Sequence, residues 1–149
     1  MKKILILIIF LTAACGYQPI YISKNTENYT FKEITLTGND KINKKIVSAL
    51  NLKKDSTGVN KNEAYIDSDI NIFVTSKNSK GQITSYRTTI TLNFKIKDNN
   101  EITKNKKFLK DFSYNNKENK FKLTEYQKSI EKSLTKKIIE EMVIYLDLQ

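Results

Sequence analysis

The segment ITSYRTTITLNFKIK, residues 83–97, determines the fold that we predict for this chain. Apolar and polar residues alternate along it, as in a β-strand with one buried and one solvated face. At about 3.4 Å per residue the strand is about 50 Å long, which is unusual in a protein of this size. The buried face is predicted to carry Tyr86, Ile90, Leu92, Phe94 and Ile96, and the solvated face Ser85, Arg87, Thr89, Thr91, Asn93, Lys95 and Lys97.

Strands of the same kind are predicted on both sides of this segment. Residues 64–75 carry apolar side chains at even positions, and residues 101–114 repeat the pattern. Turn-forming residues at 78–81 and 98–100 separate the three segments, which we therefore expect to pair as antiparallel neighbours. The inward side chains of the two flanking strands are predicted to be Ala64, Ile66, Ile70, Ile72, Val74, Phe108, Phe112 and Tyr114.

Two helices are predicted from apolar residues that recur at three- and four-residue intervals. The longer spans residues 124–147 and is opened by a capping box of Thr124 and Gln127. The shorter spans residues 40–50 with Asp40 as its N-cap. Their apolar ridges are Tyr126, Ile130, Leu134, Ile138 and Met142 in the long helix, and Ile42, Ile46 and Leu50 in the short one.

A first strand at residues 30–37, with Ile34 and Leu36 pointing inward, precedes the short helix, and residues 51–63 are predicted to be a loop. The order is thus strand, helix, three strands, helix. We expect a single α+β domain over residues 29–149, in which an antiparallel or mixed sheet of about four strands packs against two helices.

The N-terminus has the pattern of a bacterial lipoprotein signal. Lys2 and Lys3 precede the apolar run 4–11, which is too short to span a bilayer and ends at the small residues Thr12-Ala13-Ala14 before Cys15. In a lipobox this cysteine receives a diacylglycerol, and after cleavage its amino group is acylated. We expect a signal peptide at 1–14 and an acylated tether at 15–28. The alternative is an ordinary secretory signal followed by an incidental cysteine.

Gly16, the second residue after the predicted cleavage, is not aspartate, and in the usual sorting pattern of lipoproteins this indicates the outer membrane. Lipid on Cys15 would serve as anchor rather than as a cofactor, and no other cofactor is expected.

Composition excludes several classes of site. The chain has no histidine, and Cys15 is its only cysteine, so histidine-dependent catalysis, histidine-ligated metals and disulfides are excluded. Carboxylates alone could still carry out acid–base chemistry. The formal charge is +10, which favours an anionic partner, and for an exported protein anionic envelope lipid is a better candidate than nucleic acid. The alternative is compositional drift, because Arg87 is the only arginine among the 26 cationic residues.

Two groups of side chains are candidates for a site. Asp67 and Asp69 are two apart on one predicted strand and so share a face, where they could share a proton or a cation or simply be solvated. Arg87 is in phase with Lys95 and Lys97, and an arginine offers the forked geometry that suits phosphate. This row of cations is predicted either to bind lipid phosphates or to be simply solvated.

Three segments resemble the LPS-assembly lipoprotein family (LptE), particularly its alphaproteobacterial forms. The segment CGYQPIY at 15–21 is similar to the family's Cys-Gly-aromatic-x-Pro-Leu-Tyr start. TSYRTTITLNFKIKD at 84–98 resembles its arginine-bearing strand, and SYNNKENKF at 113–121 its passage from strand to C-terminal helix. The chain departs from the family in three ways. It has Thr12 in the lipobox, it has Ile20 where the family has leucine, and it has lysine or asparagine where relatives tend to carry arginine or alanine.

The resemblance implies a role without catalysis. Family members occupy the lumen of the outer-membrane β-barrel LptD, help it to fold, plug the translocon that delivers lipopolysaccharide to the cell surface, and bind lipopolysaccharide. Applied to this chain, Cys15 is the lipid anchor and Arg87, Lys95 and Lys97 are candidate contacts for lipopolysaccharide. The competing hypothesis is a periplasm-facing lipoprotein that serves an inner-membrane transporter or binds the cell wall.

Overall fold

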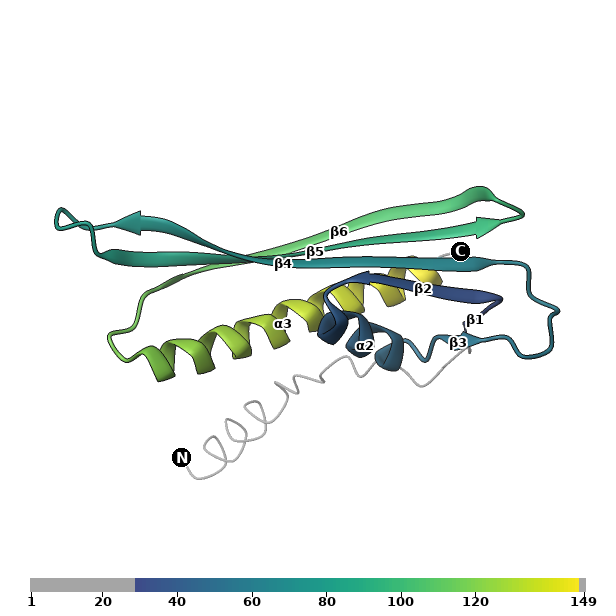
Figure 1. Cartoon of the computed structure of the whole chain (residues 1–149), viewed down its shortest axis with the longest axis horizontal. Helices are drawn as coiled ribbons and strands as arrows, with labels where there is room; N and C mark the ends of the chain where they lie inside the picture. The colour runs from purple at the N-terminus through teal and green to yellow at the C-terminus, as the bar shows by residue number, and fades with distance from the viewer. Residues whose placement is uncertain (1–28, 148–149) are drawn as a thin grey trace, which may run out of the picture.

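The computed structural model describes residues 29–147, which form two layers, a sheet and a pair of helices on one of its faces (Figure 1). This confirms the predicted α+β class, and two very short strands are added to the predicted order. The predicted signal peptide and tether lie outside the described residues. The elements are β1 (Thr30–Phe31), β2 (Glu33–Gly38), α2 (Asp40–Ala49), β3 (Lys53–Lys54), β4 (Glu63–Lys77), β5 (Ile83–Asp98), β6 (Glu101–Asn115) and α3 (Lys120–Asp147).

The central strand of the meander is β5, which pairs antiparallel with β4 on one side and β6 on the other. The β5–β6 hairpin turns at Asn99 and Asn100, whose φ angles are 47° and 71°. Two successive positive φ angles are typical of a type I′ turn, which asparagine tolerates and which matches the twist of the strands. The three long predicted strands are thus confirmed.

The fourth strand of the sheet, β2, runs parallel to β4, so the sheet is mixed and has the order β2-β4-β5-β6. The connection from β2 to β4 passes through α2, as a parallel connection requires. Our prediction of Asp40 as N-cap is wrong by one position. The carboxamide oxygen of Asn39 accepts the backbone N–H of Ile42 at 3.1 Å, because Asn39 has the extended backbone of a cap.

The helices cover the sheet face formed by the even-numbered residues of β4 and β5. Of the two residues of β2 that were predicted to point inward, Ile34 packs against this core, whereas Leu36 is 40% exposed, against the prediction. Ile72 and Val74 are exposed as well, against the prediction that they point into the core, because β2 and α2 end before they reach this part of β4. The core is Phe31, Ile42, Ile46, Leu50, Leu52, Ala64, Ile66, Ile90, Leu92, Phe94, Ile96, Phe108, Tyr114, Ile130, Leu134, Ile138, Ile139, Met142 and Leu146.

The long helix α3 begins one turn before its predicted start. The carboxamide oxygen of Asn119 accepts the N–H of Lys122 at 3.1 Å, which satisfies a free donor of the first turn. The capping box at Thr124 is therefore wrong, and the Thr124 hydroxyl instead donates to the carbonyl of Lys120 within the helix. Within residues 29–147, neither helix has an apolar stretch long enough to cross a membrane.

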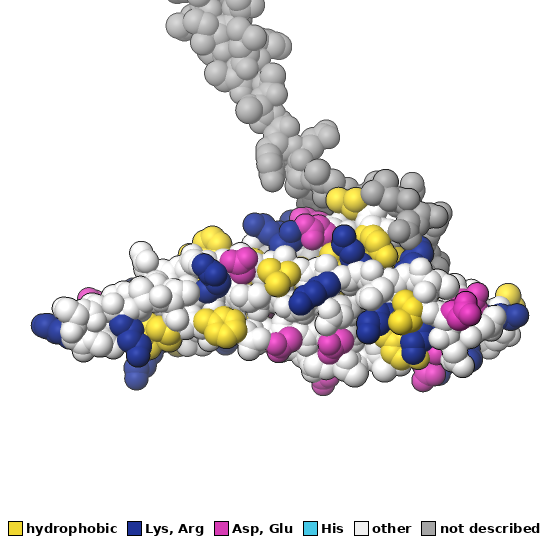
Figure 2. All heavy atoms as spheres, turned by 90° about the horizontal axis from the view of Figure 1, so that it is seen from above, with side chains coloured by type: hydrophobic (Ala, Val, Ile, Leu, Met, Phe, Trp, Pro, Cys, Tyr) yellow, Lys and Arg dark blue, Asp and Glu magenta, His cyan; other side chains and the backbone are white. Residues whose placement is uncertain are grey.

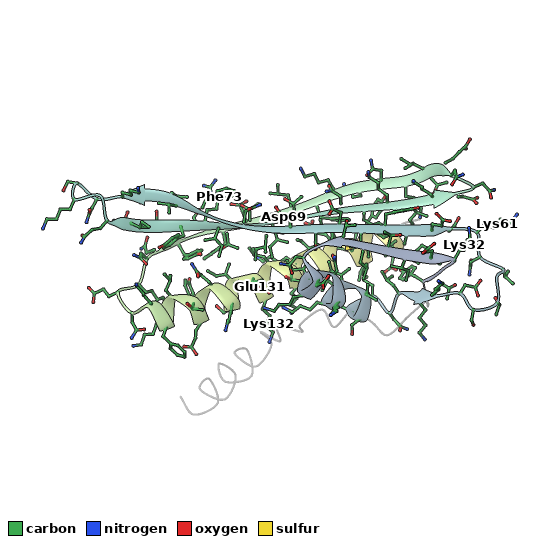
Figure 3. All side chains as sticks on the ribbon, in the orientation of Figure 1. Lys32, Lys61, Asp69, Phe73, Glu131 and Lys132 are labelled. Atoms are coloured by element: carbon green, nitrogen blue, oxygen red, sulfur yellow. The ribbon has the colours of Figure 1, made fainter. Side chains whose placement is uncertain are left out.

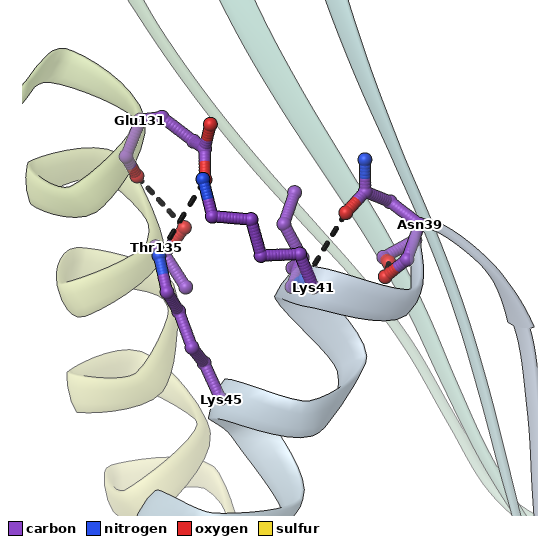
Figure 4. Close-up of polar contacts among 7 residues, drawn as sticks. Asn39, Lys41, Lys45, Glu131 and Thr135 are labelled. Carbon is purple, nitrogen blue, oxygen red and sulfur yellow. Dashed lines mark hydrogen bonds and ion pairs between the residues drawn. The ribbon is translucent and has the colours of Figure 1, made fainter. Parts of the chain in front are cut away.

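An ion cluster joins the two helices. The Glu131 carboxylate of α3 lies between Lys41 Nζ at 2.9 Å and Lys45 Nζ at 3.4 Å, both on α2 (Figure 4). Burial by itself would raise the pKa of Glu131, but the hydrogen bonds and charges of the two lysines outweigh burial and leave this pKa below its ordinary value. The cluster therefore stabilises the contact between α2 and α3 while Glu131 is ionised.

Glu131→Gln is expected to remove a pH-dependent part of the stability. Because the pKa of Glu131 is lower in the folded state, its contribution is complete above the unfolded pKa and is lost as pH falls through the folded value. The loss should stay below about 1 kcal/mol, because the lysines are partly solvated. Urea unfolding at pH 7 and pH 3.5 measures it, and Glu125→Gln, an exposed change on the same helix, is the control. Equal pH dependence in wild type and Glu131→Gln would contradict the assignment.

Candidate functional site

The outer face of the sheet is covered by no element among residues 29–147 (Figure 1). Odd-numbered side chains of β4 and β5 point to this face, and basic, acidic and apolar groups are interspersed along the elongated body (Figure 2). This open sheet face is a long surface on which the described part of the chain could meet a partner.

At one end of this face lies a shallow groove of about 740 Å³, which we call the lysine groove. Two rows of side chains, each crossing all four strands, form its floor, and these rows follow from the strand register. One row is Thr35, Tyr65, Lys95 and Asn105, the other is Thr37, Asp67, Asn93 and Lys107, and Ile66, Lys97 and Ile102 complete the lining.

The two aspartates do share the outer face, as predicted, but polar neighbours hold each of them. Asp67 accepts hydrogen bonds from the Thr37 hydroxyl at 2.9 Å and the Asn93 carboxamide at 3.2 Å. Asp69 accepts one from the Asn71 carboxamide. Within residues 29–147, no cluster of three or more Asp, Glu, Cys or His side chains could hold a metal ion. These hydrogen bonds hold the Asp67 side chain in the floor of the groove, and the two aspartates do not act together as a carboxylate pair.

An aromatic ring supports one side of the groove. Lys97 Nζ lies 4.6 Å from the centroid of the Tyr65 ring, and the Tyr65 hydroxyl donates to Glu63 at 2.9 Å. Glu63 also forms an ion pair with Lys32 at 3.0 Å. The hydrogen bond from Lys32 lowers the pKa of Glu63, and hydrogen bonding to this carboxylate raises the pKa of Lys32 and of Tyr65. Glu63 thus forms its ion pair with Lys32, and the Lys97 ammonium instead contacts the face of the Tyr65 ring.

Three ammonium groups remain available in the groove. Lys95, Lys97 and Lys107 form no ion pair with any side chain of the described part of the chain, residues 29–147. Only Asp67 opposes their charge within the lining. Such a concave cationic surface with hydroxyl and amide donors can bind phosphate or carboxylate groups.

Arg87 shares the face but lies apart from the groove. It is eight residues from Lys95 on the same strand, which is about 27 Å at the usual rise. Its Nε donates to the Ser113 hydroxyl at 3.0 Å and lies 3.7 Å from an Asp111 carboxylate oxygen. The structure therefore brings Lys95 and Lys97 together and keeps Arg87 elsewhere. Sequence reasoning missed Lys107, which joins the groove only through the register between β5 and β6.

The predicted anchor Cys15 and the predicted sorting residue Gly16 lie outside the described residues. They stay predictions, as does the assignment of Arg87, Lys95 and Lys97 to lipopolysaccharide.

Solved structures of bacterial lipoproteins have a similar fold. The rare lipoprotein B of Shewanella oneidensis aligns with a TM-score of 0.60 and 10% identity over 77% of this chain and 93% of that one. The uncharacterized lipoprotein B of Nitrosomonas europaea aligns with a TM-score of 0.54 and 8% identity over 78% of this chain and 83% of that one. No protein-family model and no curated protein matches the sequence. At these identities the likeness establishes the α+β fold.

Proposed function

We propose that the chain is an outer-membrane lipoprotein of the LptE type, a subunit without catalytic activity in the translocon that delivers lipopolysaccharide to the cell surface. Lipid on Cys15 anchors it. The folded domain occupies the lumen of the LptD β-barrel, assists its assembly and binds lipopolysaccharide.

The observation that carries the proposal is the elongated two-layer fold, which the chain has in common with the rare lipoprotein B of Shewanella oneidensis. The 28 residues of α3 correspond to about 42 Å, and β5 lies along most of that length. A long body with one open sheet face that carries many charged and polar groups fits the hydrophilic interior of a wide barrel. The CGYQPIY segment at 15–21 adds a lipid attachment site of the family's type.

The lysine groove supports the binding of a phosphorylated lipid. Lys95, Lys97 and Lys107 present three ammonium groups over one concavity of about 740 Å³. Phosphate groups of lipopolysaccharide are the anions that an outer-membrane protein meets at its site of action. Arg87, held by Asp111 and Ser113, contributes less to this binding than the groove lysines.

Changing Lys95, Lys97 and Lys107 together to glutamine is expected to weaken binding of purified lipopolysaccharide at least tenfold. Each ammonium near an anionic surface is worth about 1 kcal/mol, so three can supply the roughly 1.4 kcal/mol of a tenfold change. Titration with labelled lipopolysaccharide in detergent measures the dissociation constant. The control is Lys122, Lys128 and Lys132 to glutamine, which removes the same charge from α3. Equal losses in the two variants would contradict a site in the groove.

The test of the proposed function is a mild-detergent pull-down of the full chain from its native membranes, with the stoichiometry of co-purifying proteins measured by mass spectrometry. A large outer-membrane barrel protein near one-to-one is the expected result. Recovery of the chain with an inner-membrane transporter, or with no stoichiometric partner, would overturn the proposal. The accessory-lipoprotein hypothesis would replace it in the first case.

A further inference from the structure

Half of β4 has one edge that no strand covers among residues 29–147. The parallel strand β2 pairs with β4 only as far as Ser68, opposite Gly38. There the chain turns into α2, and the N–H of Asn39 donates to the Ser68 carbonyl at 2.8 Å. Beyond Ser68 the sheet order leaves β4 with a partner on its β5 side alone, so the backbone groups of its other side are open.

The alternation of the strand defines which backbone groups are open. The N–H and C=O of one residue point to the same side of a strand, and those of the next residue point to the other side. Because the Ser68 carbonyl points toward β2, the groups of Ile70, Ile72 and Val74 point to the free edge. The register of β4 is irregular after Val74, so the open row ends there and extends about 14 Å.

The side chains along this edge are apolar on both faces of the sheet. Ile72 is 47%, Phe73 54% and Val74 45% exposed, and Phe73 projects from the outer face together with Asp69 (Figure 3). Residues 69–76 contain no lysine, arginine or proline. The opposite edge strand, β6, carries lysines that protect an edge against pairing, namely Lys104, Lys106, Lys107 and Lys110. The β4 edge lacks this protection and is suited to bind a strand.

Two charged side chains mark the ends of the free edge. Asp69 lies at one end and Lys77 at the other, and neither forms an ion pair with a side chain of residues 29–147. Opposite charges on a neighbouring strand stabilise the pairing. The edge therefore fits a short apolar strand that carries a cation near Asp69 and an anion near Lys77.

The length of the open row limits the kind of partner. A strand that continues past Ser68 would meet Thr37 and Gly38 of β2, which already pair with Asp67 and Ser68. A strand of the barrel wall does not fit either, because wall strands of a closed barrel pair on both sides and have no free edge. A short extended loop satisfies both conditions, since its backbone groups are unpaired and its length is limited.

We propose that an extended loop of the barrel protein pairs with the free β4 edge and adds a strand to the sheet in line with β2. This inference rests on the proposed function, in which the barrel protein surrounds the domain. The loop bonds to the backbone of Ile70, Ile72 and Val74. Its alternate side chains cover Ile72 and Val74 on the inner face, which β2 and α2 do not reach. In strand addition the backbone supplies affinity and the alternate side chains supply specificity.

Hydrogen exchange on the full lipidated chain in detergent tests the pairing, first in the free chain and then in the complex with the co-purified barrel protein. The amides of Ile70, Ile72 and Val74 are expected to exchange at least about tenfold more slowly in the complex, because they form new hydrogen bonds. The control is the β6 edge, where the N–H of Leu109 points away from β5 by the same alternation. Equal slowing at both edges, or slow exchange of the β4 amides already in the free chain, would overturn the proposal.

Ile72→Pro removes one of the three open N–H groups. This N–H takes no part in the pairing with β5, and proline is tolerated on an edge strand where its nitrogen faces outward. In the complex of this variant, the amides of Ile70 and Val74 are expected to return to their exchange rates in the free chain. Leu109→Pro is the matched control and should leave these amides slow. Unchanged protection of Ile70 and Val74 in the Ile72→Pro complex would contradict the pairing.

Photo-cross-linking identifies the occupant of the edge. A photoreactive phenylalanine analogue replaces Phe73 in the full chain, and in the control it replaces Leu109, which is similarly exposed on β6. A cross-link from position 73, but not from position 109, to one loop of the barrel protein is the expected result. A cross-link from position 73 to a wall strand, to a second copy of the chain or to residues 15–28 of the same chain would overturn the proposal.

The pull-down separates failure of this inference from failure of the proposed function. If no barrel protein co-purifies with the chain, the proposed function fails and this inference fails with it. If the barrel protein co-purifies but the β4 amides exchange as they do in the free chain, this inference alone fails.

Discussion

Gly38→Ala is expected to destabilise the fold by more than about 3 kcal/mol. Gly38 has a φ of +81°, which costs an L-residue about 1 to 2 kcal/mol by itself. A Cβ atom built there would lie 1.9 Å from the carbonyl oxygen of Ser68 and 2.9 Å from its carbon. This carbonyl accepts the N–H of Asn39 at 2.8 Å, so it cannot move aside without a loss of that bond. We therefore expect the substitution to push the end of β2 and the start of α2 away from Ser68 of β4.

Urea unfolding followed by circular dichroism measures this effect, and the chain offers a matched control. Gly58 has a similar φ of +73°, but a Cβ atom added to it would have no atom within 4 Å. Gly58→Ala should therefore cost only the conformational term of about 1 to 2 kcal/mol. Similar losses in the two variants would show that the close approach of Gly38 to Ser68 does not limit the side chain.

A second buried polar contact holds the same junction. Asn43 of α2 is fully buried, donates to the Thr37 carbonyl at 2.7 Å and accepts from the Ser68 hydroxyl at 2.7 Å. Movement of Ser68 in the Gly38 variant would break this contact too and leave buried polar groups without partners. This is a further reason to expect a loss at the upper end of single-residue effects.

Phe94→Ala is expected to destabilise the protein by about 3 to 5 kcal/mol. Phe94 lies on the inner face of β5, opposite Ile66 of β4, and has no exposed surface. Its removal leaves a cavity in the layer between sheet and helices, where neighbouring side chains cannot collapse without moving a strand or α3. The midpoint of urea unfolding should fall accordingly, with the slope unchanged.

Phe121→Ala is the control for this second prediction. Phe121 lies in the first turn of α3 and is 70% exposed, so its removal should change stability by less than about 0.5 kcal/mol. A small effect of Phe94→Ala, close to that of Phe121→Ala, would contradict the placement of Phe94 at the centre of the core.

Strong periodicity made the longest elements predictable. The apolar ridge of α3 and the alternation in β5 each extend over enough residues to identify both the element and its buried face. The two asparagines after β5 likewise identify the hairpin. Weaker local signals failed at the ends of helices, where Asn39 and Asn119 cap in place of the residues that the sequence favoured.

Contacts between distant segments could not be read from the sequence. The parallel pairing of β2 with β4 joins residues far apart in the chain, such as Ile34 and Ala64, and no local pattern encodes it. The short strands β1 and β3 are too brief to show a period. The exposure of Ile72 and Val74 has the same origin, since alternation predicts a face but not how far the covering elements extend.

The candidate site was predictable in part for the same reason. The phase of β5 correctly placed Arg87, Lys95 and Lys97 on one face of the sheet. It could not show that Asp111 of β6 would form an ion pair with Arg87, nor that Lys107 of β6 would join the groove. Both facts depend on the register between two strands, which only the folded sheet fixes.

The parallel pairing of β2 with β4 also has a consequence for the order in which the domain folds. The β4–β5–β6 meander has contacts that are close in sequence and can form quickly, whereas β2 has no strand to pair with until β4 is in place. We therefore expect β2 and α2 to dock onto the meander in a later step. Until that step Ile42 and Ile46, which are fully buried in the finished domain, remain exposed on α2.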